Sequence, residues 1–292
     1  MDMNSLREWI EGASIHSIDQ GIVPSAQQLS PFALTDTLTT YSGEQNQPFV
    51  HLWQLDQTMI LGMKDTRVPH FDQGIAALQA DGYRPIIRNS GGLGVIADQG
   101  VLNLSLILPQ SDQHKLAIDQ AYTFLWDWLR CTFETPKHVI EAYEIQTSYC
   151  PGTFDLSIGG KKFAGIAQRR VKRGIAIMAY LSVNGDQLLR GEVVRRFYQK
   201  GLADAFGKDG YPPVDPHVMA NLDALLGQPL TVATAKDLLL QSLQQQTGVS
   251  VTPYSVNQLL GLNGNQADYD KQREKMLQRN LQLQEDPYDL FL

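Results

Sequence analysis

Cysteine is scarce in this 292-residue chain, which contains only Cys131 and Cys150. Two cysteines are too few for a disulfide framework or for a zinc site of the C-x-x-C type. The six histidines show no ligand spacing either, so we expect no metal site. So little cysteine is typical of a protein of the reducing cytoplasm, which is where we expect this one to act.

Long apolar runs and a surplus of positive charge are absent as well. No window approaches eighteen uncharged apolar residues, and the charged N-terminus lacks the apolar core of a signal peptide, so we expect neither membrane insertion nor export. The formal net charge is -7, from 31 acidic and 24 basic residues, which argues against a nucleic-acid partner. Hydrophobic residues make up 43% and charged residues 19%, a composition that excludes a disordered or fibrous chain.

Helix and strand patterns alternate irregularly up to about residue 186. Ser30-Pro31 predicts a helix start, because Ser caps free N–H groups and Pro at the first position has none to lose, and this helix is expected to end near Gly43. A second helix is predicted over 112–134 from apolar residues at helical spacing. The predicted strands are 49–56 and 58–62, expected as a hairpin, then 84–89, 101–109, 139–145, 154–158, 161–169 and 175–183.

The pattern becomes helical after Asp186, without a strong strand signal. Helices are expected near 187–204, 216–226, 233–246 and 265–284. We therefore predict an α+β fold with a largely antiparallel sheet and packed helices. The expected divisions are an N-terminal extension (1–30), a central domain (31–228) and a helical C-terminal region packed on it (229–292).

A glycine-rich segment, R-N-S-G-G-L-G from Arg88 to Gly94, lies between two predicted strands. Glycines let backbone N–H groups approach a phosphate or an acyl carbonyl closely. The segment matches neither the dinucleotide pattern nor the P-loop. Taken alone, it is more simply explained as a tight turn than as a ligand loop.

Cys150 lies in the turn S-Y-C-P-G-T, where an exposed thiol would suit a nucleophile and a buried one would be a small hydrophobic side chain. Cys131 falls on the apolar stripe of the second predicted helix, so we expect it in the core.

A third segment, G-G-K-K-F-A-G-I-A over 159–167, reads as a hairpin turn that opens into a strand. Strand alternation places Lys162 on one face and Gly165 on the other. Lys162 then either points into a cleft or is a solvated surface lysine. The stretch that follows is basic, and it suits docking of a negatively charged partner through Arg169, Arg170 and Lys172.

In their order and spacing these segments resemble the lipoate and octanoate protein ligase and transferase family. The resemblance rests on R-N-S-G-G-L-G-V-I-A-D-Q-G-V-L-N (88–103), S-Y-C-P-G and G-G-K-K-F-A-G-I-A. The ligases usually read R-R-x-G-G-G-x-V-x-H-D, whereas here Asn89, Leu93 and Ala97 replace the second Arg, the third Gly and the His. ATP-dependent ligases need no cysteine, so these departures together with Cys150 favour the amidotransferase branch, the octanoyl-[glycine cleavage H protein]:protein N-octanoyltransferases.

The resemblance implies the fold of the biotin and lipoate protein ligase catalytic domain, with residues 31–228 as an acyltransferase domain. It implies that Cys150 carries an octanoyl or lipoyl group as a thioester and that Lys162 holds the acyl carbonyl. The implied donor is octanoylated glycine cleavage H protein, and the acceptors are E2 lipoyl domains of 2-oxoacid dehydrogenases, without ATP, metal or other cofactor. The implied substrate-binding residues are Arg88, Ser90, Gly91, Gly92, Asn103 and Gly165.

Two alternatives stay open at this point. One is an octanoyltransferase that takes its acyl group from acyl carrier protein and uses the same cysteine. The other is an acyl-carrier binding module that keeps the fold without the chemistry.

Overall fold

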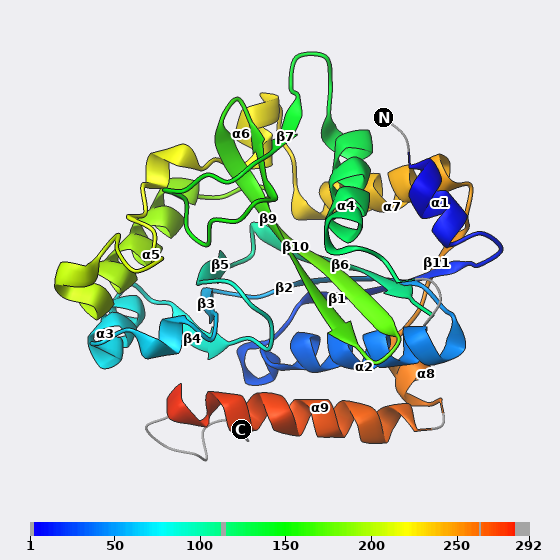
Figure 1. The fold of residues 1–292 in the computed structure, drawn as a ribbon, viewed down its shortest axis with the longest axis horizontal. Helices are drawn as coiled ribbons and strands as arrows, with labels where there is room; N and C mark the ends of the chain where they lie inside the picture. Colours follow the sequence, from blue (N-terminus) through cyan, green and yellow to red (C-terminus); the bar gives the residue numbers. More distant parts are fainter. Residues whose placement is uncertain (1–2, 112–114, 263, 284–292) are drawn as a thin grey trace.

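A computed structural model of the chain describes residues 3–111, 115–262 and 264–283 (Figure 1). Its centre is an eight-stranded mixed sheet. From one edge to the other the strands are β11 (Val251–Pro253), β1 (Ile15–Ile22), β2 (Phe49–Gln54), β6 (Val101–Pro109), β10 (Gly174–Ser182), β9 (Lys161–Val171), β8 (Asp155–Ile158) and β7 (Ile140–Ala142). β1 pairs in parallel with β11 and β2, and the five pairs from β2–β6 to β8–β7 are antiparallel. The expected α+β fold with a largely antiparallel sheet is confirmed.

One face of this sheet is covered by helices that lie above it in Figure 1. Alternate residues of β6, including Leu102, Leu104 and Leu106, are buried on this face and belong to one core with Trp128. The indole N–H of Trp128 donates to the carbonyl oxygen of Leu239 at 2.9 Å, which joins two of the helices. The helices of this layer are α4 (Ile118–Phe133), α7 (Val232–Thr247) and α1 (Asn4–Trp9).

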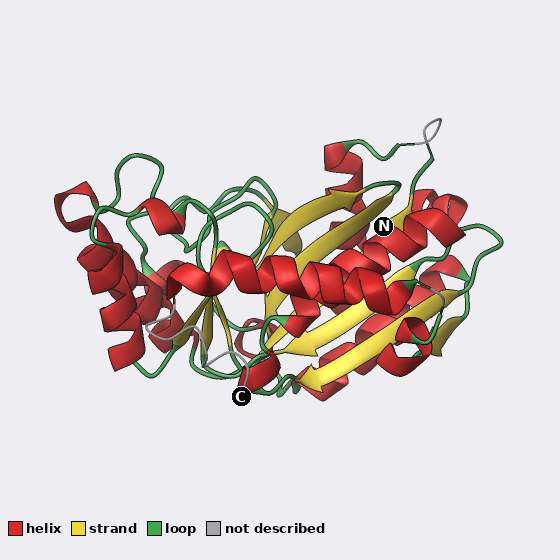
Figure 2. Ribbon diagram, turned by 90° about the horizontal axis from the view of Figure 1, so that it is seen from below, coloured by secondary structure: helices red, strands yellow, loops and turns green. Residues whose placement is uncertain are grey.

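The opposite face carries α2 (Ser30–Gln45), which packs in turn against α9 (Asn265–Asn280). Figure 2, seen from below, shows α9 crossing the molecule in front of the sheet. Phe49 of β2 and Ile107 of β6 pack against Leu34 on this side. Farther along the same face lies the cavity described below.

A smaller sheet continues the fold beyond the end of β2, at the left of Figure 1. It packs with two helices around a second core that includes Ile86 and Phe197. Its strands are β4 (Arg84–Ile87), β3 (Thr58–Leu61) and β5 (Val95–Ala97), and the two helices are α3 (Phe71–Ala80) and α5 (Gln187–Leu202). The remaining short elements are α6 (Leu222–Leu226), α8 (Val256–Leu260), η1 (Ser25–Gln27), η2 (Asp65–Arg67), η3 (Ala203–Ala205), η4 (Pro216–Val218) and η5 (Leu281–Leu283).

Most predicted helices and strands are confirmed, but three expectations are wrong. Segments 49–56 and 58–62 form no hairpin, because β2 belongs to the main sheet and β3 to the small one. All residues of both strands are buried, so each needs partners from elsewhere in the chain rather than from its neighbour alone.

The region after Asp186 contains β11, whose three partly exposed residues give no strand pattern. Ser30 lies within the first turn of α2 and makes no side-chain capping bond among the described residues.

The ends of two predicted helices and the predicted divisions of the chain can be compared with the structure. Residues 112–114 and 284 of two predicted helices lie outside the described residues, and α4 begins at Ile118. β1, from the predicted N-terminal extension, lies between β2 of the central domain and β11 of the predicted C-terminal region. Within the described ranges, none of the helices combines the length and apolar character that a membrane crossing needs.

Candidate functional site

A cavity of about 330 Å³ lies on the sheet face that carries α2. Its floor is a single row of residues in register across five strands: Trp53, Asn103, Tyr180, Gly165 and Asp155. Residues in register share a face of the sheet, so this row directs its side chains toward the cavity. The glycine-rich segment and the turn around Cys150 form the opposite wall. The fold therefore brings together the three segments that the sequence singled out.

Cys150 stands in this wall, half-buried, with a φ of 47°, a left-handed conformation that residues with a Cβ rarely adopt. Two donors face its sulfur. The backbone N–H of Leu93 lies 3.1 Å from Sγ, and Nη2 of Arg88 lies 3.8 Å from it. Both donors direct positive charge at the same point, which suits a sulfur or an oxygen that becomes negative during a reaction.

Gly92 leaves room for this arrangement. Its φ is 95°, and a Cβ built on it would lie 3.0 Å from Sγ of Cys150 and 2.5 Å from Nη2 of Arg88. Only glycine fits this position without moving the sulfur or the guanidinium. The prediction that Gly92 lies beside the substrate site agrees with this geometry, and its role in binding stays a prediction.

Arg88 holds the glycine-rich segment in shape. Its guanidinium is buried and donates from Nη2 to the carbonyl oxygens of Gly91 at 2.7 Å and Leu93 at 2.8 Å. Ser90 and Gly91 line the cavity beside it. Arg88 thus braces the loop and also presents its charge to the Cys150 sulfur.

Asp65 anchors the end of the same segment. The Tyr198 hydroxyl accepts a hydrogen bond from the Gly94 N–H at 3.1 Å and donates one to Asp65 at 2.8 Å. Burial raises the pKa of Asp65 to about 6, although hydrogen bonds from Tyr198 and the Gly62 N–H oppose the shift. The folded protein therefore retains a proton that the unfolded chain releases near pH 4.

This proton gives a pH-dependent stability. Because the pKa of Asp65 is raised on folding, its contribution is fully present below about pH 4 and is lost as the pH rises through about 6. Two pKa units correspond to about 3 kcal/mol. We expect the free energy of unfolding of the wild type, minus that of Asp65→Asn, to fall by this amount between pH 4 and 7 in urea titrations. A constant difference over this range would contradict the buried carboxyl.

Lys162 lies beneath the Cys150 turn and is only 1% exposed. Its Nζ is 2.8 Å from Oδ1 of Asp155, and it donates to Ser148 Oγ at 3.0 Å and to the carbonyl oxygens of Tyr149 at 3.0 Å and Cys150 at 2.9 Å. The buried ammonium therefore fixes the turn that carries the cysteine. Burial raises the pKa of Asp155, and the charge of Lys162 opposes that shift.

The expected alternation along β9 is wrong at one point. The pairing of β8 with β9 shifts register between Leu156 and Ser157, which leaves Phe163 as an extra residue. Such a bulge turns the strand by one position, so Lys162 and Gly165 share the cavity face instead of lying on opposite faces. A Cβ built on Gly165 would be 3.7 Å from Nζ of Lys162. The bulge thus places the lysine under the cysteine.

Arg169 is not a free docking charge. Its Nη2 lies 2.8 Å from a carboxylate oxygen of Asp36, a buried residue of α2, and its Nη1 donates to the Asn89 carbonyl oxygen at 2.8 Å. The Asn89 side chain donates to the same carboxylate at 2.9 Å. Arg169 therefore ties the glycine-rich segment to α2, and carrier docking by Arg169, Arg170 and Lys172 stays a prediction.

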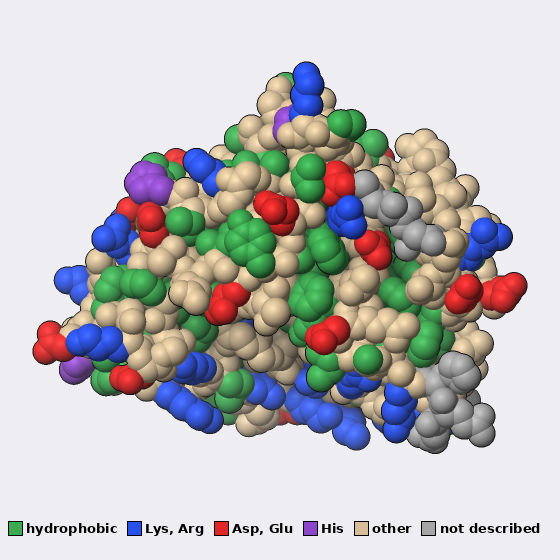
Figure 3. All heavy atoms as spheres, turned by 45° about the horizontal axis from the view of Figure 1, so that its top comes forward, with side chains coloured by type: hydrophobic (Ala, Val, Ile, Leu, Met, Phe, Trp, Pro, Cys, Tyr) green, Lys and Arg blue, Asp and Glu red, His purple; other side chains and the backbone are tan. Residues whose placement is uncertain are grey.

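Arg170 and Lys172 lie near the turn between β9 and β10. Arg170 is exposed, and its hydrogen-bond acceptors, the Leu116 carbonyl and two glutamine side chains, are uncharged. Lys172 forms an exposed ion pair with Glu44 at 2.7 Å. Figure 3 shows Lys and Arg side chains gathered along the lower edge of the molecule, the side on which Figure 1 places this turn.

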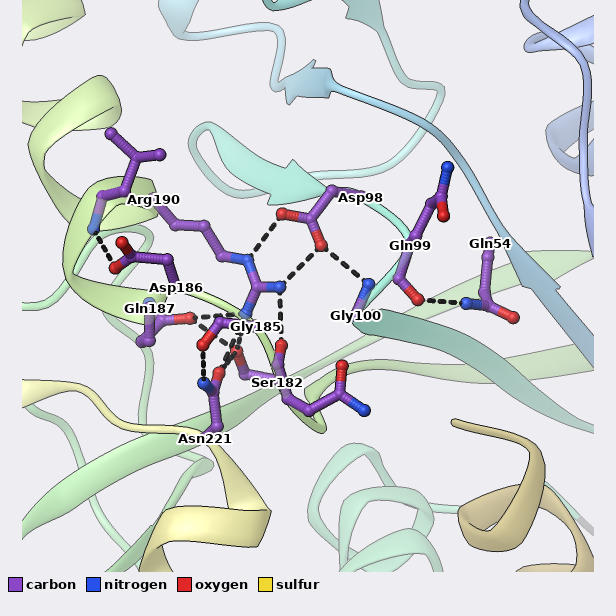
Figure 4. Close-up of polar contacts among 12 residues, drawn as sticks. Gln54, Asp98, Gln99, Gly100, Ser182, Gly185, Asp186, Gln187, Arg190 and Asn221 are labelled. Atoms are coloured by element: carbon purple, nitrogen blue, oxygen red, sulfur yellow. Dashed lines mark hydrogen bonds and ion pairs between the residues drawn. The ribbon is translucent and has the colours of Figure 1, made fainter. Parts of the chain in front are cut away.

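A buried network built on Arg190 of α5 supports the site from behind (Figure 4). Its Nη2 and Nε lie 2.6 and 2.7 Å from the Asp98 carboxylate. Its Nη1 donates to the Ser182 hydroxyl at 2.9 Å and to the Asn221 side chain at 2.8 Å. The network joins the turn between β5 and β6 and the end of β10 to α5.

The network also reaches the cysteine turn. Gln187 belongs to it and donates to the Tyr149 hydroxyl at 3.2 Å, one residue before Cys150. Asp98 lies in the sequence A-D-Q-G-V-L-N, and no role was predicted for Asp98 itself. Its pairing with Arg190 supplies that role.

Sequence reasoning missed Asp155, Asp36 and Tyr180. Asp36 had a signal, because it is an acidic residue in the middle of a helix whose neighbours are apolar or threonine, and a buried charge needs a partner. Asp155 had a weaker signal, since it is an acidic residue within the predicted strand 154–158, five residues after Cys150. Tyr180 reads as an ordinary strand aromatic, and only the register shows that it lies opposite Gly165.

Comparisons with known proteins agree with the geometry. Residues 27–244 match the lipoyl protein ligase A/B catalytic domain. The chain is 40% identical over 254 residues to the octanoyl-[GcvH]:protein N-octanoyltransferase of Oceanobacillus iheyensis, covering 86% of this chain and 88% of that protein. It is 41% identical over 228 residues to the lipoyl-[GcvH]:protein N-lipoyltransferase of Listeria monocytogenes, covering 78% and 82%. Lipoate-protein ligase A bound with ATP shares the fold, with a TM-score of 0.66 at 13% identity over 90% of this chain and 94% of that one.

Proposed function

This chain belongs to the lipoyl protein ligase A/B catalytic domain family, and we propose that it transfers an octanoyl or lipoyl group between protein lysines through a thioester on Cys150. The donor is octanoylated glycine cleavage H protein, as the names of the relatives indicate, and the acceptor is the lysine of an E2 lipoyl domain. The observation that carries the proposal is the Cys150 sulfur in the wall of a 330 Å³ cavity, with two donors directed at it.

The first half of the reaction breaks an amide. Sγ of Cys150 attacks the carbonyl carbon of the octanoyl-lysine, the C–N bond breaks, and the lysine amine leaves with the proton that the thiol gives up. The oxyanion forms beside the sulfur, where the Leu93 N–H and the Arg88 guanidinium stabilise negative charge. Lys162 relays this proton: after exchanging one of its present oxygen partners, its ammonium protonates the leaving amine, and its nitrogen takes up the proton that the thiol gives up.

The second half restores the enzyme. The amine of the acceptor lysine attacks the thioester, the C–S bond breaks, and the thiol regains its proton. One amide replaces another, so the overall free energy change is near zero and the reaction runs without ATP. Trp53, Phe32 and Met178 line the cavity, so a bound acyl chain displaces water there, and each buried methylene of the chain contributes about 0.8 kcal/mol to binding.

The direct test of the function is to compare donors. Purified protein and apo lipoyl domain are incubated with octanoylated glycine cleavage H protein, and separately with octanoyl-acyl carrier protein, and the octanoylated lipoyl domain is measured by mass. We expect transfer from the first donor. Transfer from acyl carrier protein alone would favour the octanoyltransferase alternative, and no transfer from either donor would favour the binding module.

Docking of the carrier is expected to depend on charge at Arg170 and Lys172. Reversing both to Glu should raise KM for the donor about tenfold at 10 mM salt and much less at 150 mM, because the screening length falls from about 30 Å to about 8 Å. The matched control is Lys161→Glu at the opposite, exposed end of β9. A loss that is independent of salt, or equal in the control, would place docking on another surface.

A further inference from the structure

Asn103, on the floor of the cavity, carries an unpaired amide nitrogen in its side chain. Its side chain is 7% exposed, and its Nδ2 is buried without a hydrogen-bond partner in the part of the chain that the structure describes. On β6 it stands in register between Trp53 and Tyr180, which both line the cavity, so its side chain lies on the cavity face. A buried donor without a partner lowers the stability of the protein by about 1–3 kcal/mol. An apolar residue at the same position would carry no such penalty. Such a donor is typical of a site that awaits an acceptor.

Asn103 lies two strands away from Gly165, the member of the row nearest to the cysteine turn. The Cys150 carbonyl oxygen is 2.9 Å from Nζ of Lys162, and that nitrogen is 3.7 Å from the Cβ position of Gly165 on β9. Gly165, Tyr180 and Asn103 are successive members of one row, so Asn103 is two strand spacings farther on, about 10 Å. An acyl chain attached to Cys150 therefore brings its distal carbons to Asn103, while its carbonyl stays near Leu93 and Arg88.

We propose that Asn103 is a specificity residue that favours acyl chains with a hydrogen-bond acceptor in their distal half. This inference rests on the proposed function. The methylenes of an octanoyl chain accept no hydrogen bond, so the amide stays unpaired beside them. A cyclic disulfide at the end of the chain, as in a lipoyl group, offers sulfur atoms that accept weakly. Because Nδ2 of Asn103 is buried, even a weak acceptor relieves it, so the geometry favours the lipoyl cargo over the octanoyl cargo.

The test compares two cargos on one carrier. For the wild type and Asn103→Leu, kcat/KM is measured with H protein that carries either octanoyl or lipoyl, and apo lipoyl domain as acceptor. We expect the ratio of the lipoyl value to the octanoyl value to fall five- to tenfold in Asn103→Leu. Asn103→Val also removes the N–H donors, in a smaller side chain, and it should lower the ratio in the same direction.

The outcomes separate this inference from the proposed function. An equal loss with both cargos would mean that Asn103 holds the carbonyl or supports the fold, and an unchanged ratio would mean that its amide meets no acceptor. Either result overturns the specificity role while the transfer activity stands. A wild type that transfers neither cargo from H protein would overturn the function itself.

Discussion

Replacing Cys150 with alanine is expected to lower the rate of acyl transfer by about 10⁴-fold or more, because the variant has no nucleophile to carry the acyl group. Both halves of the proposed reaction pass through the same sulfur, so substrate binding alone recovers little of the rate. The Leu93 N–H and the Arg88 guanidinium would remain in place but would have no sulfur to act on. The assay uses octanoylated H protein as donor and apo lipoyl domain as acceptor. Mass spectrometry at successive times measures the octanoylated lipoyl domain.

Two variants control this result. Cys131 packs against the main core, and burial raises the pKa of its thiol, so Cys131→Ala should transfer at the wild-type rate. Cys150→Gly should be as inactive as Cys150→Ala yet more stable by about 1 kcal/mol, because glycine adopts the φ of 47° without strain. Equal activity of the Cys150 and Cys131 alanine variants would refute the nucleophile.

Replacing Lys162 with methionine is expected to lower the free energy of unfolding by about 3–5 kcal/mol and to abolish transfer. Removing one partner of a buried ion pair leaves the other charge uncompensated, and here the remaining charge is Asp155. The Cys150 turn also loses the ammonium that its carbonyl oxygens accept from. Urea denaturation measures the first effect and the transfer assay measures the second.

A double variant separates the two effects. Lys162→Met combined with Asp155→Leu removes both buried charges, and we expect it to regain most of the lost stability. Transfer should stay absent in it, because the proposed reaction needs a proton donor for the leaving amine. If transfer returns together with stability, Lys162 only neutralises Asp155 and takes no part in the chemistry.

The sequence predicted those helices, strands and turns that depend on short local patterns. The apolar run of β6 and the turn at Gly159-Gly160 predicted a central strand and a hairpin, and both are present. The glycine-rich segment, Cys150 and Lys162 were grouped by a family resemblance, and the structure places the first two in the cavity lining and Lys162 directly beneath the Cys150 turn. Local patterns therefore predict many of the helices and strands, whereas the proposed reacting groups came from the family resemblance.

The rest depends on long-range pairing, which composition and spacing do not encode. The bulge at Phe163 follows from how β8 pairs with β9, and it reversed the predicted face of Lys162 relative to Gly165. Arg169 reads as a docking charge because its partner, Asp36, lies 133 residues away in the chain. A sequence shows that a residue is charged, but only the fold shows whether that charge already has a partner.

The central claim is a transient octanoyl thioester on Cys150, and intact mass spectrometry tests it most directly. The enzyme is mixed with octanoylated H protein without an acceptor, quenched in acid and weighed. We predict a mass increase of one octanoyl group that maps to the peptide containing Cys150, disappears with hydroxylamine and is absent in Cys150→Ala. An enzyme that transfers the acyl group yet never gains this mass, or an adduct that persists in Cys150→Ala, would contradict the account.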